Sequence, residues 1–119
     1  MTSTDGRSVS GVVLVLVTSP DEEAGRALAR RLVNEGLIAC GSVIPGLTSV
    51  YRWKGEVQED PEVLLLLKTT SDALPEVKRR VMELHSYDVP EFLALPVTEG
   101  SDRFLRWVMA EVRSRGDSS

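Results

Sequence analysis

The sequence predicts an α+β fold in which four strands and two helices follow the order β-α-β-β-α-β, with one more helix at the C-terminus. A continuous β-branched and leucine run from Val12 to Thr18 suits a central strand that is buried on both faces. Apolar residues then recur at helical spacing in two separate segments. Between those segments, the stretch from Leu47 to Lys68 contains two long extended arms that fold back on each other at Lys54-Gly55.

The first helix is expected directly after the first strand. Ser19 suits the N-cap, Pro20 suits the first helical position, and Glu22 lies three residues beyond the cap, as in a capping box. Gly36 supplies the stop signal. The apolar face of this helix is expected to consist of Ala24, Ala27, Leu28 and Leu32.

The second and third strands form one long ribbon. The second covers Leu37 to Ile44 and continues from Leu47 to Trp53, and the intervening Pro45-Gly46 indicates a bend or bulge. The third runs from about Glu56 to Thr69. Pro61 lies inside it and has no N–H to donate, so this part of the ribbon is expected at a sheet edge.

The remaining elements follow the same kind of signal. Ser71-Asp72 opens a second helix, and a short strand is expected from Phe92 to Thr98. Gly100-Ser101-Asp102 starts the last helix. The stripe of the second helix recurs at steps of three, four and three residues and consists of Leu74, Val77, Val81 and Leu84. The apolar face of the last helix is expected to consist of Phe104, Leu105, Val108, Met109 and Val112.

This order is the split β-α-β sandwich of the ferredoxin-like fold. The first and third strands are the most apolar and should be central, and right-handed crossovers place both main helices on one face of the sheet. The other face is then left bare, and the arms of the ribbon are roughly twice the usual strand length of about 5 or 6 residues. Because exposed edges and apolar faces pair with other chains, we expect a subunit of an oligomer.

Length and composition indicate one globular domain over residues 12–113, with flexible tails at 1–11 and 114–119. The net charge of −4 argues against nucleic acid as a partner, since phosphate binding needs a cationic surface. No apolar run approaches the ~20 residues of a membrane span, so no membrane partner is expected. The single cysteine cannot form an internal disulfide, which favours a cytoplasmic location.

Few residues are candidates for chemistry. His85, the only histidine, is either a helix-end residue whose ring caps carbonyls or a ligand or proton-handling group in a cleft. Cys40 is expected to be a buried, inert thiol, and the alternative is a nucleophilic pair with His85. Lys68 is a surface lysine, an anchor for an anion or a partner of Glu91.

An acidic run surrounds the start of the third strand. Exposed strand charges discourage aggregation, and the alternative is weak binding of divalent cations. The acidic run consists of Glu56, Glu59, Asp60 and Glu62.

Motifs of common enzyme classes are absent from the sequence. It has no phosphate loop, no dinucleotide fingerprint and no Ser-His-Asp set with recognisable context, so the protein is not expected to be an enzyme.

Several longer motifs resemble one known family. From Val12 to Trp107 the sequence is similar to CutA, the divalent-cation tolerance protein family, over about four fifths of the chain. The matching motifs are Thr18-Ser19-Pro20-Asp21, Leu37-Ile38-Ala39-Cys40, Ile44 to Glu56, Leu67-Lys68-Thr69-Thr70, His85 to Glu91 and Ala94-Leu95-Pro96-Val97.

The resemblance implies a tight homotrimer of ferredoxin-like subunits, with an architecture similar to PII signalling proteins and a link to tolerance of copper and other divalent metals. The copper ligands assigned in some members are a cysteine and two adjacent histidines, and their positions here are Val17, Leu84 and His85. Only His85 is retained, and we take it as the candidate metal ligand. The other matching positions, expected near a cleft between subunits as a cofactor-binding site or interface, are Trp53, Lys68, Tyr87 and Glu91.

Three functional hypotheses follow. The leading one is a non-enzymatic homotrimer linked to the divalent metal response, with a metal ion such as copper bound in an intersubunit cleft. The alternative is a PII-like trimer that senses a small molecule or nucleotide without a metal. The third is an enzyme that uses His85, Lys68 and Glu91 for acid–base work.

Overall fold

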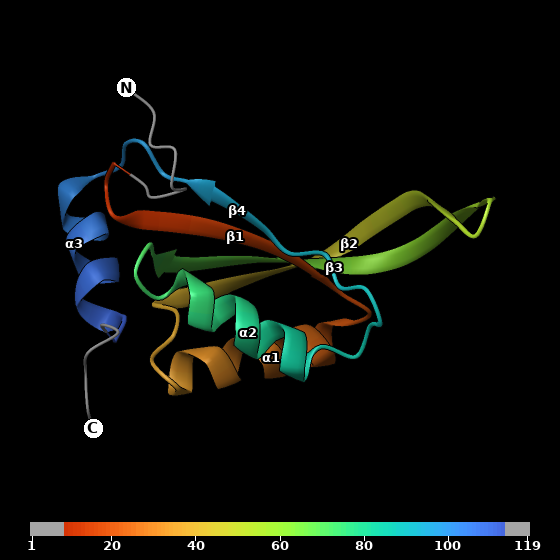
Figure 1. Ribbon diagram of the computed structural model, residues 1–119, viewed down its shortest axis with the longest axis horizontal. Coiled ribbons are helices and arrows are strands. Elements are labelled where there is room, and N and C mark those ends of the chain that lie inside the picture. The colour runs from red at the N-terminus through yellow and green to blue at the C-terminus, as the bar shows by residue number, and fades with distance from the viewer. Residues whose placement is uncertain (1–8, 114–119) are drawn as a thin grey trace.

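The computed structural model contains one four-stranded antiparallel sheet in the order β2-β3-β1-β4 (Figure 1). The strands are β1 (Val12–Ser19), β2 (Cys40–Trp53), β3 (Glu56–Thr70) and β4 (Leu93–Pro96), and the helices are α1 (Glu22–Asn34), α2 (Leu74–Leu84) and α3 (Asp102–Glu111). The structure describes residues 9–113. Of the flexible tails expected at 1–11 and 114–119, residues 1–8 and 114–119 lie outside this range. Within it, the Ser10 hydroxyl donates to the Val97 carbonyl at 2.6 Å.

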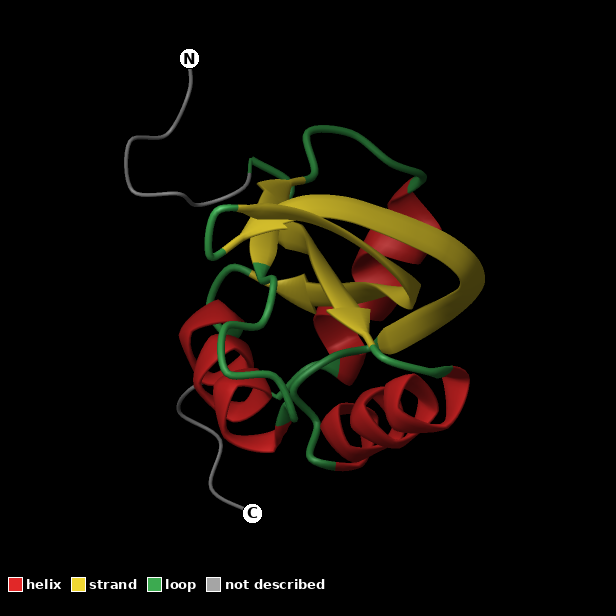
Figure 2. Ribbon diagram, turned by 90° about the vertical axis from the view of Figure 1, so that its right-hand side faces the viewer, coloured by secondary structure: helices red, strands yellow, loops and turns green. Residues whose placement is uncertain are grey.

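The predicted ferredoxin-like arrangement is confirmed. β1 pairs with both β3 and β4, so β1 and β3 are the central strands. Figures 1 and 2 show α1 and α2 on the same face of the sheet, while α3 packs at the end of β1 and β3. None of the helices in residues 9–113 is long and apolar enough to cross a membrane.

The two faces of the sheet differ sharply. Val15 pairs with Leu67 and Val17 with Leu65, and all four side chains are fully buried in one core with residues of α1 and α2. Because successive side chains of a strand point to opposite faces, the residues between them lie on the side away from the helices. We call this side the open face, and its apolar members are Leu14, Leu16, Ile44, Leu64, Leu66, Leu93 and Leu95.

The β2–β3 ribbon extends well beyond the helices as a two-stranded arm (Figure 1). A register shift between Ile44 and Leu47 confirms the predicted bulge. β1 ends where Ser19 pairs with Val63, so beyond that point β3 has only β2 beside it, which confirms the edge position of Pro61. The arm closes at Lys54 (φ 51°) and Gly55 (φ 82°), two positive φ values in succession as a type I′ turn requires.

The predicted capping box of α1 is wrong. Asp21, not Ser19, is the N-cap, and its carboxylate accepts a 2.8 Å hydrogen bond from the Ala24 amide. Ser19 is instead the last residue of β1, because it still pairs with Val63 of β3. Leu28 and Leu32 point into the core as expected, whereas Ala27 is exposed.

The predicted apolar face of α3 is only partly correct. Val108 and Val112 are buried and Leu105 packs against the core, but Phe104 and Met109 are exposed. A helix that buries positions 105, 108 and 112 turns positions 104 and 109 outward, since residues one position from the stripe lie about 100° away. Phe104 instead lies against Trp107, with ring centroids 5.7 Å apart and ring planes tilted by 38°.

Some predicted boundaries also shift. β2 begins at Cys40 instead of Leu37, and β4 spans Leu93–Pro96 instead of Phe92 to Thr98. α2 begins at Leu74, three residues later than expected, because Thr70 Oγ1 first accepts the Ala73 amide in a turn.

An ion pair ties α1 to α2. Arg80 donates to Glu35 through Nε and Nη2, both at 2.8 Å, and Arg31 donates to the same carboxylate at 2.8 Å. The hydrogen bond from Arg80 is the largest cause that lowers the pKa of Glu35, from 4.5 to about 2. Glu35 and Arg80 are 29% and 20% exposed at their side chains, so solvent screens this pair less than it screens the other ion pairs of the helices.

Glu35→Gln is expected to lower the free energy of unfolding by about 1–2 kcal/mol at pH 7, less than the full pKa shift because the pair is partly solvated. The folded pKa lies below the unfolded one, so the stabilisation is present above about pH 4.5 and is lost as the pH falls towards 2. Urea unfolding of both proteins from pH 7 to pH 2 checks this, and the two curves should converge in acid. Glu22→Gln is the matched control, because the Glu22–Arg26 pair is far more exposed. A constant gap between wild type and Glu35→Gln at every pH would contradict the assignment.

Candidate functional site

The His85 imidazole is held by hydrogen bonds at both nitrogens. His85 ends α2, and its amide donates to the Val81 carbonyl at 2.9 Å. Its Nε2 lies 2.6 Å from the Thr18 carbonyl, and its Nδ1 lies 3.1 Å from the Tyr87 amide. Because a carbonyl only accepts and an amide only donates, these partners select the neutral imidazole with the proton on Nε2. The ring therefore does bond a carbonyl, but one of β1 instead of the helix end.

Two tyrosines bond the acidic run of β3. Tyr87 lies against the His85 ring, with centroids 4.7 Å apart, and its hydroxyl donates to Glu62 at 2.7 Å. Desolvation and this hydrogen bond raise the pKa of Tyr87. Tyr51 donates to Asp60 in the same way, and that bond raises the pKa of Tyr51. Asp60 and Glu62 are thus hydrogen-bond acceptors within the chain as well as surface charges.

Lys68 lies away from this group. Its Nζ donates to Ser42 Oγ at 2.6 Å, and no ion pair among the described residues joins it to Glu91. Along β3, Lys68 is four positions from Leu64, which pairs with Thr18, a separation of roughly 13 Å at about 3.3 Å per residue. Of the alternatives given for Lys68, pairing with Glu91 is therefore not found among the described residues, and the Lys68 ammonium bonds Ser42 instead.

Cys40 lies beside Lys68 in the sheet. It pairs directly with Lys68 in the β2–β3 register and is half-buried. Because it lies at the Lys68 end of the sheet, it is also roughly 13 Å along the strands from the Thr18 carbonyl that holds His85. The structure therefore rules out the alternative of a Cys40–His85 nucleophilic pair.

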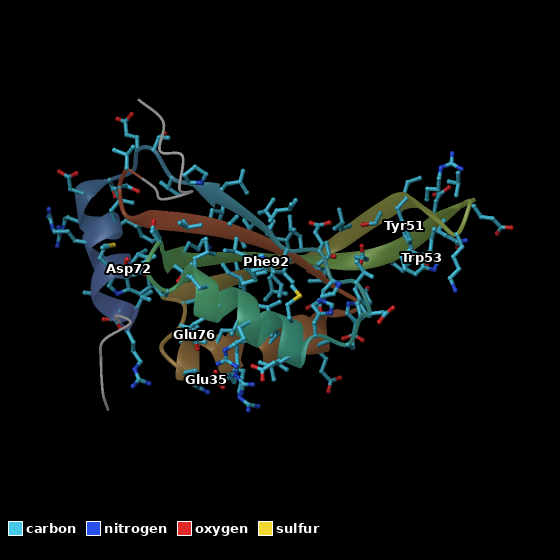
Figure 3. The ribbon with its side chains drawn as sticks, viewed as in Figure 1. Glu35, Tyr51, Trp53, Asp72, Glu76 and Phe92 are labelled. Atoms are coloured by element: carbon cyan, nitrogen blue, oxygen red, sulfur yellow. The ribbon has the colours of Figure 1, made fainter. Side chains whose placement is uncertain are left out.

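The predicted site residues are only partly brought together. His85 and Tyr87 are in contact, and Glu91 is exposed on the loop that follows them. Trp53 is 45% exposed at the tip of the arm beside Tyr51 (Figure 3). Sequence reasoning missed the Thr18 carbonyl and the role of Glu62 as the tyrosine acceptor. A backbone acceptor leaves no signal in the sequence, because every residue carries one.

The residues at the expected copper positions do not form a complete metal site in one chain. Val17 and Leu84 have hydrocarbon side chains, which carry no donor atom, and both pack in the core. Both ring nitrogens of His85 already have hydrogen-bond partners. Across residues 9–113 no three His, Cys, Asp or Glu side chains cluster in a way that could hold a metal ion. Soft copper sites need several such donors, and the described residues of one subunit do not bring them together.

Comparison with known proteins identifies the family. Residues 13–111 match the family described as CutA1 divalent ion tolerance protein. The chain is 55% identical over 95 residues to the Divalent-cation tolerance protein CutA of Thermus thermophilus, covering 80% of this chain and 92% of that protein. It is 46% identical over 102 residues to Protein CutA, chloroplastic, of Arabidopsis thaliana, covering 86% of this chain and 56% of that one.

A solved structure shares the fold. The structure of the divalent cation tolerance protein (Cut A1) from Thermus thermophilus superposes with a TM-score of 0.83 at 51% identity, over 86% of this chain and 99% of that chain. The match extends over nearly all of the domain that carries His85, the open face and the arm. The chain belongs to the CutA1 divalent ion tolerance protein family.

Proposed function

We propose that this protein acts, without catalysing a reaction, as a homotrimer in the cellular response to divalent metal ions. The observation that carries the proposal is the open face of the sheet, together with membership in a family named for divalent ion tolerance. Leu93 is 54% exposed and Leu95 43% exposed on this face, beside Leu14 and Leu16 of the central strand. Contiguous exposed apolar surface of this kind marks an interaction site.

Self-association is the simplest way to cover this face. Within one chain, both main helices lie on the opposite side of the sheet and do not cover the open face (Figure 2). Beyond Val63 the arm consists of β2 and β3 alone, so both of its outer edges are unpaired. The backbone groups of these edges can form hydrogen bonds with strands of other copies. A trimer, rather than a dimer, is proposed on the resemblance to the family.

We propose His85 as a metal contact in the assembled protein. We propose Nδ1 as the contact atom, because its partner is the Tyr87 amide in the loop after α2, whereas Nε2 is bonded to the Thr18 carbonyl of the central strand β1. The other ligands have to come from another subunit or from water, since the described residues of one chain do not complete a site. Copper suits an imidazole nitrogen, and it is the ion we propose to test first.

His85→Ala is expected to weaken Cu²⁺ binding at least about tenfold, because it removes the one imidazole of the chain. Calorimetric titration of the assembled protein measures this. Glu91→Ala serves as the control for a nearby exposed loop residue. Copper affinity that stays the same in His85→Ala would remove His85 from the proposal and leave the assembly untouched.

Two other hypotheses gain no support. The acid–base trio of His85, Lys68 and Glu91 is not assembled in the chain, because Lys68 bonds Ser42 at a distance from His85. The long effector loop of a signalling protein has no counterpart in the arm, which closes in a two-residue turn. A cytoplasmic location remains part of our proposal, on the ground that the sequence holds a single cysteine.

A further inference from the structure

A cavity of about 250 Å³ opens between α1 and the end of α2. One side is apolar and is formed by Ala24, Ala27, Leu28 and Leu84. The polar part of the lining comes from Ser19, Arg31 and the His85-Ser86 segment. The cavity lies in the helical layer, on the opposite side of the sheet from the open face.

The Ser19 hydroxyl is the most informative group of the lining. Ser19 is only 2% exposed, yet its hydroxyl takes part in no hydrogen bond among residues 9–113. Among the described residues, every side-chain nitrogen or oxygen that is sealed from solvent has a hydrogen-bond partner. Because the Ser19 hydroxyl has none, it must retain access to solvent. Ser19 is among the residues that line the cavity. A nearly buried hydroxyl that faces a cavity is available to a ligand, because buried polar groups are normally satisfied.

Arg31 supplies the charge. Its Nε bonds Glu35, and that carboxylate also receives two bonds from Arg80, so one carboxylate is shared by two guanidinium groups. The Nη groups of Arg31 can therefore bind a second anion, and a guanidinium matches the planar shape of a carboxylate. His85 contributes ring surface rather than a donor atom, because both of its nitrogens are engaged elsewhere.

From these features we propose that the cavity binds a small organic carboxylate with a short aliphatic chain. The chain lies against the alanine and leucine wall, and the carboxylate accepts from Arg31 and Ser19. The volume equals that of roughly eight waters at about 30 Å³ each, which suits a ligand of roughly seven non-hydrogen atoms such as pentanoate. This site is independent of the proposed metal function, since it uses neither ring nitrogen of His85.

Titration of the ¹⁵N-labelled full-length protein with sodium pentanoate tests the proposal by NMR. Saturable amide shifts are expected at Ser19, Arg31 and Ser86, with at least fivefold weaker binding of 1-pentanol, which lacks the charge. Ala27→Leu fills the cavity from an exposed helical position and should weaken pentanoate binding at least fivefold. Ser19→Ala should weaken it as well.

Ala110→Leu on the exposed side of α3 is the matched control and should bind pentanoate as the wild type does. Unshifted amides outside the cavity in Ala27→Leu verify that the variant is folded. The proposal is overturned if pentanoate gives no saturable shifts, or if a folded Ala27→Leu binds it as tightly as the wild type. Equal affinity for 1-pentanol would overturn the role of Arg31.

Discussion

Leu66→Glu is expected to convert the assembled protein into single subunits of 13.1 kDa. Leu66 lies on the open face, where it pairs with Leu16 on β1 and Ser42 on β2. In a single subunit a glutamate at this position can reach water. In an assembly it would be buried among leucines, and burying an unpaired charge costs several kcal/mol per subunit. Association should therefore be lost while the fold is kept.

Light scattering coupled to size exclusion measures this change at micromolar concentration. The wild type should elute with roughly three times the chain mass, as the family resemblance implies. Met82→Glu is a suitable control, because Met82 is exposed on α2, in the layer of helices on the other side of the sheet. A Leu66→Glu protein that keeps the mass of the wild type would show that the open face is not the interface.

Leu65→Ala is expected to destabilise the fold itself by about 2–5 kcal/mol, because it leaves a cavity in a well-packed core. Leu65 is fully buried, pairs with Val17 and lies within 3.0 Å of the position that a Cβ on Gly25 of α1 would occupy. The helix approaches the sheet closely at this point, so the space left by the shortened side chain cannot easily be filled by neighbours.

The neighbouring residue provides a matched comparison. Leu66→Ala removes the same atoms one position along β3, but from the open face. Urea unfolding at several protein concentrations should show a loss of stability in Leu65→Ala that is independent of concentration. The loss in Leu66→Ala should grow as the protein is diluted, because it acts on association. If both variants lose stability in the same way at every concentration, the two faces are not used differently.

The alternation of residues in β3 explains why much of the fold could be predicted. The unbroken run from Leu64 to Leu67 indicated a central strand with apolar side chains on both faces, and the structure places that strand beside β1. The helical stripe of α2 and the bulge at Pro45-Gly46 were predicted correctly as well. Each of these features depends on residues close in sequence, so local pattern was sufficient.

The candidate site was harder to predict. His85 and Tyr87 were chosen from the sequence, but their partners are the Thr18 carbonyl and Glu62, which come from different strands. The predicted set also included Trp53 and Lys68, which lie elsewhere on the ribbon. Nothing in the local sequence tells which strand end meets the loop after α2, because the distance along the chain is 67 residues for Thr18 and His85.

The sequence by itself determined the order of elements, the central strands and the edge position of Pro61, since periodicity and turn residues are local properties. Its motifs also resemble those of the family to which the chain belongs. Only the tertiary structure decided that Ser19 ends a strand instead of capping a helix, that Phe104 faces outward, and that the His85 ring is fixed at both nitrogens. These outcomes depend on how segments distant in sequence compete for the same neighbours. That competition is settled by packing and by the satisfaction of backbone hydrogen bonds.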